Sequence, residues 1–100
     1  MNAYELRGPG GTVTITAGAM AQIVSQAAER ADGVRVRRPR RGLDVEVDRG
    51  RVRVELELAA PYGAVLPDVA RAAQERVADA LAGMCGLIVE AVDVSIEELD

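Results

Sequence analysis

The strongest constraint on the fold is a run of alternating apolar and charged residues from 43 to 58, LDVEVDRGRVRVELEL. Every second residue is valine or leucine, apart from the four central residues, DRGR. A period of two is that of a β-strand with one buried and one exposed face. Because Gly50 suits the positive φ of a two-residue hairpin loop, the run predicts two antiparallel strands joined by a tight turn.

The charges of this run predict how its two strands pair. With residues 49 and 50 in the loop, Asp48 faces Arg51 on the exposed side. Glu46 then faces Arg53 on the same side. Exposed pairs of opposite charge contribute about 0.2–1 kcal/mol each. They therefore favour this register over a slip along the strand.

Helices are predicted on both sides of the hairpin. Apolar residues at steps of three and four indicate amphipathic helices over 17–30 and 66–84. Thr16 can cap the first helix with its hydroxyl, and Gly86 can close the second in the left-handed conformation. Shorter alternating runs predict three further strands, at 12–16, 34–36 and 92–96.

The order of these elements defines the fold class as α+β, with the order β-α-β-β-β-α-β. Two amphipathic helices packed on one face of a mostly antiparallel sheet form a two-layer sandwich, and the charged strand positions face water. A chain of 100 residues can close one core of this size. We therefore predict a single domain over 12–100, preceded by a flexible, glycine-rich lead-in over 1–11.

The composition excludes several kinds of site. The chain has no histidine and one cysteine, Cys85, so the usual zinc ligand sets and an internal disulfide lack their residues. All twelve basic residues are arginine, so a nucleophilic serine would have neither a histidine nor a lysine as its base. We predict that the protein is not an enzyme and that it has no catalytic residue, cofactor, metal or small-molecule substrate.

No segment is expected to span a membrane. The longest apolar stretches fall well short of the roughly eighteen residues that cross a bilayer, and the N-terminus lacks the apolar region of a secretory signal. The sequence therefore predicts a cytoplasmic protein that reaches a membrane only through a partner.

The segment RVRRPRR, residues 35–41, places five arginines in a chain of formal net charge −4. Pro39 breaks the strand that begins here, so the arginines should project into solvent. The simplest interpretation is a solvated connector whose charges repel one another. The alternatives are contact with an acidic surface of another copy or a partner, and contact with membrane headgroups or nucleic acid.

Tyr62 is the second candidate for an interaction. It occupies the sequence PYG between the hairpin and the second helix. Its ring either covers an edge of the core, with its hydroxyl in water, or anchors a partner surface. The candidate interaction residues are Arg35, Arg37, Arg38, Arg40, Arg41 and Tyr62.

Three stretches carry a family resemblance: GTVTITAGAMAQIVSQAAERADGV (11–34), RVRVELELAAPYGAVLPDVARAAQERVADALAGMCGL (51–87) and VEAVDVSI (89–96). Their most specific elements are the GV after the first helix, the YG before the second, the QERV within it and the glycine that leads to VDVSI. In this order and spacing the chain resembles the bacterial alkaline shock protein family, general-stress proteins linked to the cell envelope.

This resemblance implies a non-catalytic scaffold of the envelope stress response, which self-associates and binds a membrane-anchored partner. The alternative, from another class, is a small nucleic-acid-binding module that uses the arginines of 35–41. The acidic net charge disfavours that module. It also lacks Phe, Trp and His to stack on bases, and each stacked base contributes about 1–3 kcal/mol. Nucleic acid is therefore not an expected partner.

Overall fold

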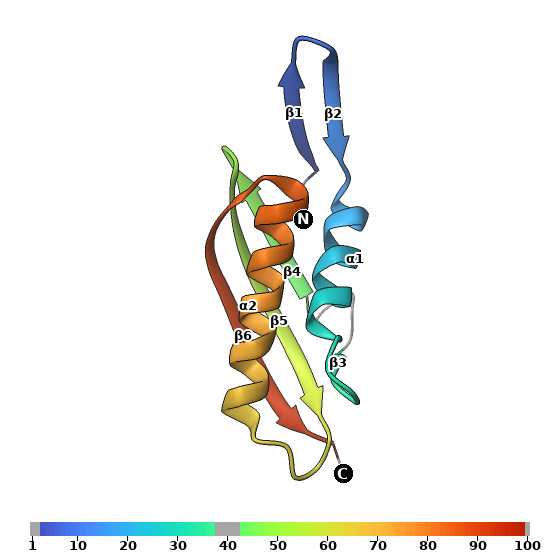
Figure 1. The fold of residues 1–100 in the computed structure, drawn as a ribbon, viewed down its shortest axis with the longest axis vertical. Helices are drawn as coiled ribbons and strands as arrows, with labels where there is room; N and C mark the ends of the chain where they lie inside the picture. Colours follow the sequence, from blue (N-terminus) through green and yellow to red (C-terminus); the bar gives the residue numbers. More distant parts are fainter. Residues whose placement is uncertain (1–2, 38–42, 100) are drawn as a thin grey trace.

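The computed structural model describes residues 3–37 and 43–99. Its elements, in chain order, are β1 (Tyr4–Gly8), β2 (Gly11–Ile15), α1 (Ala17–Ala28), β3 (Arg35–Val36), β4 (Leu43–Asp48), β5 (Arg51–Ala60), α2 (Leu66–Cys85) and β6 (Ile88–Glu98). Both helices cover one face of the sheet formed by β3 to β6 (Figure 1), with α1 against β3 and β4 and α2 against β5 and β6. The predicted α+β sandwich is confirmed.

Strand β5 is the centre of the sheet. β6 pairs with it in parallel from Arg51 to Ala60, whereas β3 and β4 pair with it antiparallel. Because β6 already occupies one edge of β5 over that whole length, β3 and β4 share the other edge in tandem. β4 meets residues 51–56 of β5, and β3 meets residues 58 and 59.

The β4–β5 hairpin has the register predicted from its charges. Asp48 is opposite Arg51, and Glu46 is opposite Arg53. The two loop residues, Arg49 and Gly50, have φ values of 51° and 77°, the combination of a type I′ turn. Glycine adopts it freely, but arginine carries a Cβ that crowds the following carbonyl in this conformation. Arg49 is therefore a strained position.

The core lies between the helices and the sheet. Alternate residues of β4 and β5 point into it, as their sequence pattern predicts. The largest fully buried side chains are Met20, Val24, Val45, Val52, Val54, Leu58, Val77 and Leu81. Met84, predicted on the apolar stripe of α2, is 69% exposed, and the next residue, Cys85, is buried instead. The buried stripe of α2 therefore agrees with the predicted one at Ala73, Val77 and Leu81 and differs from it in the last turn, where it continues through Cys85.

The helix termini agree with their predicted caps. The Ala19 N–H donates to the Thr16 hydroxyl at 3.1 Å. Gly86 is left-handed, with φ 68°, and closes α2. Helix α1 ends at Ala28, two residues before the predicted end.

The first strand was not predicted. The sequence indicates a lead-in over 1–11, but residues 4–8 form β1, which pairs antiparallel with β2. Its two apolar residues, Tyr4 and Leu6, alternate only once before the glycines begin, so the stretch is too short to indicate a strand. Tyr4 and Ile15, at the base of the hairpin, pack against the core. The rest of the hairpin extends beyond the body of the molecule (Figure 1). The predicted flexibility of this region stays a prediction.

Candidate interaction surface

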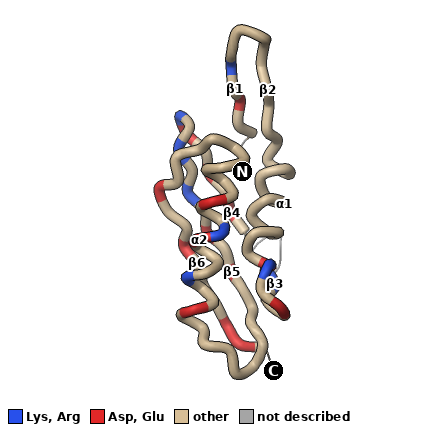
Figure 2. Tube along the Cα trace, in the orientation of Figure 1, with Lys and Arg blue, Asp and Glu red and all other residues tan. Residues whose placement is uncertain are grey.

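Among the described residues, no helix or strand covers the sheet face opposite the helices, and we call it the open face. Its charged residues on β4, β5 and β6 are Asp44, Glu46, Asp48, Arg51, Arg53, Glu55, Glu57, Glu90, Asp93 and Glu97. They alternate along each strand with residues that face the core. In Figure 2 the basic positions of β5 lie towards the β4–β5 turn, and the acidic positions lie further along the sheet. With eight carboxylates and two guanidinium groups on these three strands, the open face is acidic.

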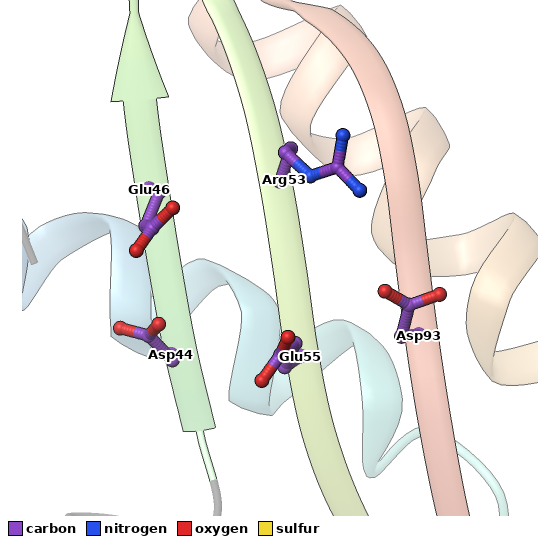
Figure 3. A pocket seen from close by; sticks show the side chains of 5 residues that line it. All are labelled: Asp44, Glu46, Arg53, Glu55 and Asp93. Carbon is purple, nitrogen blue, oxygen red and sulfur yellow. The ribbon is translucent and has the colours of Figure 1, made fainter.

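Three carboxylates form one row across the open face. Asp44 is directly opposite Glu55, and Glu55 is directly opposite Asp93. Figure 3 shows the three side chains on the same side of the sheet. Within residues 3–37 and 43–99, no arginine forms a salt bridge with any of the three. Since like charges directly opposite each other destabilise a sheet, the row is a repulsion that a cationic partner would relieve.

Arg53 lies next to this row. It is opposite Glu46 on β4, and its guanidinium extends towards β6 in Figure 3. The side chains of Asp44, Glu46, Arg53, Glu55 and Asp93 line a shallow hollow. One guanidinium among four carboxylates leaves the hollow negative. Among the residues that the structure describes, no group of three or more His, Cys, Asp or Glu could hold a metal ion.

Arg37 connects the arginine-rich segment to the sheet. Its main-chain N–H donates to the Glu57 carbonyl at 2.7 Å, and its guanidinium forms an ion pair with Glu97 of β6. Because β5 lies between β3 and β6, this ion pair crosses β5. Arg37 is therefore one predicted interaction residue that already contacts a carboxylate of its own sheet.

Of the other candidate arginines, Arg35 is exposed on β3. Arg38, Arg40 and Arg41 lie outside the described residues. The register along β5 shifts between Arg37 and Leu43. Arg37 bonds to Glu57, and Leu43 is opposite Leu56, the next residue of β5. A continuous strand would place residue 38 opposite Leu56, so the sequence between the two pairings is five residues longer than a continuous strand requires. The predicted break at Pro39 lies outside the described residues. β4, which follows, carries Asp44, the first carboxylate of the row.

Glu29 is a positioning residue that the sequence did not reveal. Its side-chain Oε2 accepts a hydrogen bond from the Val36 N–H at 2.9 Å. This contact ties the end of α1 to β3, directly before Arg37. No local pattern predicts it, because the contact spans seven residues and depends on the path of the intervening turn.

Tyr62 lies in the turn between β5 and α2 and is 79% exposed. Its ring therefore does not cover an edge of the core, as one of the two interpretations expected. The neighbouring Gly63 N–H donates to Oε2 of Glu98 at 3.3 Å, which ties the turn to the end of β6. This exposed aromatic ring lies near the end of the sheet, outside the row of carboxylates.

Cys85 faces the core. Its side chain is 2% exposed, and burial raises the pKa of its thiol. The thiolate is the reactive form of cysteine, so a buried thiol with a raised pKa is a poor nucleophile. Within the described residues, neither α1 nor α2 is long and apolar enough to cross a bilayer.

The fold and its open face define a class of protein: a small α+β domain with helices on one side of a sheet and a charged surface on the other. The sequence model of the alkaline shock protein 23 family, described by its cell envelope-related function, matches residues 35–100, which are 66 of the 100 residues. The chain belongs to this family, as the resemblance of its sequence predicts. The family is not a known enzyme family.

Several solved structures share the fold. One variant of the MamM CTD has a TM-score of 0.58 and 21% identity, over 83% of this chain and 96% of that chain. Another structure of the MamM CTD has a TM-score of 0.58 and 22% identity, over 82% and 98% of the two chains. A cadmium form has a TM-score of 0.58 and 23% identity, over 83% and 96%. At these identities the likeness shows the fold alone. No curated protein matches the sequence.

Proposed function

We propose that this protein is a non-catalytic scaffold of the cell envelope, which acts by self-association and by binding a membrane-anchored partner. The observation that carries this proposal is the open face, where β4, β5 and β6 expose eight carboxylates and two arginines. The cell envelope-related function of the family supports a role for this scaffold at the cell envelope.

The chemistry of the open face favours a cationic partner. The row of Asp44, Glu55 and Asp93 lowers the local electrostatic potential, and a guanidinium placed beside it would relieve the repulsion between opposed carboxylates. The ion pair of Arg37 with Glu97 is an example of this contact within one chain. The arginines of segment 35–41 in a second copy, or a basic segment of a membrane protein, would supply the same groups.

Sedimentation at low and high ionic strength tests the electrostatic association. We expect oligomers at low salt that dissociate at high salt, because exposed charge pairs are screened over a Debye length of about 10 Å at 0.1 M salt. The double variant Glu55→Gln/Asp93→Asn should remove the part of the association that depends on the open face. A matched control, Glu75→Gln/Asp79→Asn, makes the same charge change on α2 and should leave it intact. Equal masses at both ionic strengths would show that association is not electrostatic.

Proximity labelling in the native host tests the membrane partner. We expect the wild-type protein and the α2 control to label the same integral membrane protein, and the open-face variant to lose it. Labelling that is identical for all three proteins would place the partner contact on another surface. Labelling of soluble proteins only would contradict a membrane-anchored partner.

The nucleic-acid alternative meets an electrostatic obstacle on this surface. Phosphates would have to approach Arg35 and Arg37 beside a sheet face that carries eight carboxylates. Repulsion between these carboxylates and the phosphates opposes binding. An RNA titration distinguishes the two functions, because tight binding that weakens steeply with added salt would support the module.

A further inference from the structure

Among the described residues, none covers the apolar side chains in the outer half of the β1–β2 hairpin. Leu6 and Val13 are directly opposite each other and share one face of the hairpin with Tyr4 and Ile15. Tyr4 and Ile15 pack on the core, but Leu6 is 41% exposed and Val13 is 59% exposed. A two-stranded hairpin by itself is marginally stable in water. Its apolar outer half is therefore a surface on which further packing would stabilise the fold.

The outer edge of β1 is also free to pair. Among the described strands, β1 pairs with β2 only. In a hairpin with a two-residue loop the closing pair, here Gly8 and Gly11, is hydrogen-bonded, and such pairs recur at every second position. The main-chain groups of Glu5 and Arg7 consequently point away from β2. An edge with unsatisfied N–H and C=O groups is a template for another strand.

We propose that two copies of this chain associate through the outer edges of their β1 strands, antiparallel and centred on Leu6. This arrangement makes one four-stranded sheet in the order β2, β1, β1, β2. Glu5 of each copy lies opposite Arg7 of the other, so two pairs of opposite charge form by symmetry. Leu6 meets Leu6 of the second copy, and the apolar faces of the two hairpins become continuous.

The charge pattern selects this register over its neighbours. Residues whose main-chain groups point away from β2 can pair only with the same kind of residue in the second copy. The centre of an antiparallel pairing can therefore move only one residue at a time along β1, so that Glu5 or Arg7 still pairs with such a residue. A register centred on residue 5 places glutamate opposite glutamate. A register centred on residue 7 places arginine opposite arginine, and Glu5 then faces Pro9, which has no N–H to donate. The centre at Leu6 alone gives opposite charges.

Two further features of β1 favour pairing. It contains neither proline nor lysine, two residues by which edge strands resist association. The register centred on Leu6 also places Tyr4 opposite Gly8 of the second copy, a residue without a side chain that could crowd it. The strand is thus self-complementary in its main-chain groups, its charges and its apolar residues.

This pairing is one form of the self-association proposed above, and in that respect it rests on the proposed function. Its test uses charge reversal at the two positions. The variant Glu5→Arg carries arginine at both positions, and Arg7→Glu carries glutamate at both. Each variant alone places like charges opposite each other twice. We expect each to dimerise at least about tenfold more weakly than the wild type in sedimentation equilibrium at fixed ionic strength.

Mixing the two single variants, or exchanging the two charges within one chain, should restore the association. An equimolar mixture of the two single variants places arginine opposite glutamate at every position, so a heterodimer of wild-type affinity is expected. The double variant Glu5→Arg/Arg7→Glu exchanges the charges and should form homodimers. Because these samples contain the same substitutions as the single variants, their recovery excludes misfolding as the cause of the loss.

The outcomes separate this inference from the proposed function. Wild-type protein that stays monomeric, or single variants that dimerise as tightly as the wild type, would overturn pairing through β1. Single variants that lose dimerisation without recovery in the mixture would overturn the register. If only Glu55→Gln/Asp93→Asn abolishes association, the β1 edge is not the contact and the open face remains the proposed one.

Discussion

Gly33 and Pro61 approach each other more closely than any larger residue at position 33 would allow. Gly33 has a φ of 77°, and a Cβ added to it would lie 2.5 Å from Cγ of Pro61. The proline ring cannot rotate away as a flexible side chain would. Gly33→Ala therefore combines two costs: about 1–2 kcal/mol for a left-handed alanine and about 1–3 kcal/mol for overpacking. We expect it to lower the free energy of unfolding by about 2–5 kcal/mol.

Urea unfolding followed by circular dichroism measures this loss and can divide it into its two parts. Replacing the ring in Gly33→Ala/Pro61→Ala removes the overpacking but leaves alanine in the left-handed conformation. The double variant should therefore be more stable than the sum of the two single losses implies. The difference, a coupling energy of about 1–3 kcal/mol, measures the contact between the two residues.

Gly18 provides the matched control. It lies within α1, no atom lies within 4 Å of an added Cβ, and its backbone is helical. Gly18→Ala should raise the free energy of unfolding by about 0.5–1 kcal/mol. The reasoning is refuted if Gly33→Ala unfolds within about 0.5 kcal/mol of the wild type, or if removing the proline ring recovers nothing.

Four other changes test separate parts of the structure, each by urea unfolding. Arg49→Asn should stabilise by about 0.5–1 kcal/mol, because asparagine tolerates the left-handed conformation better than arginine, and Arg49→Ala should give no such gain. Leu81→Ala should cost about 2–5 kcal/mol because it empties a fully buried site, whereas Met84→Ala, at an exposed site on the same helix, should cost less than about 1 kcal/mol. Burial raises the pKa of Cys85, so the folded state keeps a proton that the unfolded chain loses at alkaline pH. Stability should therefore be intact below the ordinary thiol pKa and decrease as the pH rises through the raised one, and Cys85→Ala should lack this part of the decrease. Glu55→Gln should raise monomer stability by about 0.2–1 kcal/mol, since it removes two like-charge contacts, while it weakens association.

The parts of the fold that the sequence predicts are those determined by neighbouring residues. The hairpin of β4 and β5 combines a period of two, a glycine in its loop and two pairs of opposite charge within a few residues of one another. The caps at Thr16 and Gly86 are equally local, because each satisfies main-chain groups of its own helix. In such segments the chain has few alternatives, so the pattern is sufficient.

The parts that the sequence did not predict depend on contacts between distant segments. The pattern of residues 92–96 indicates a strand but does not show that β6 runs parallel to β5, because direction depends on the path of α2. The ion pair between Arg37 and Glu97 joins residues from the two edge strands of the sheet. Similarly, β1 is defined by its pairing with β2 rather than by its own short polar sequence. One of the two interpretations of Tyr62 placed its ring on an edge of the core because of its residue type, although the turn directs the ring into solvent.

The row of carboxylates is not required by the fold. The apolar faces of β4 and β5 and the charge pairs near the turn already determine the register, whereas Asp44, Glu55 and Asp93 oppose one another at some cost in stability. A solubility surface needs charge but does not need like charges directly opposite each other. If the open face served solubility only, neutralising one of the three carboxylates would change the stability of the monomer and nothing else. A docking surface predicts two effects of opposite sign from the same change, a more stable monomer and a weaker complex. This opposition distinguishes the two roles of the open face, because charge repulsion within the monomer is what an arginine from another molecule would relieve.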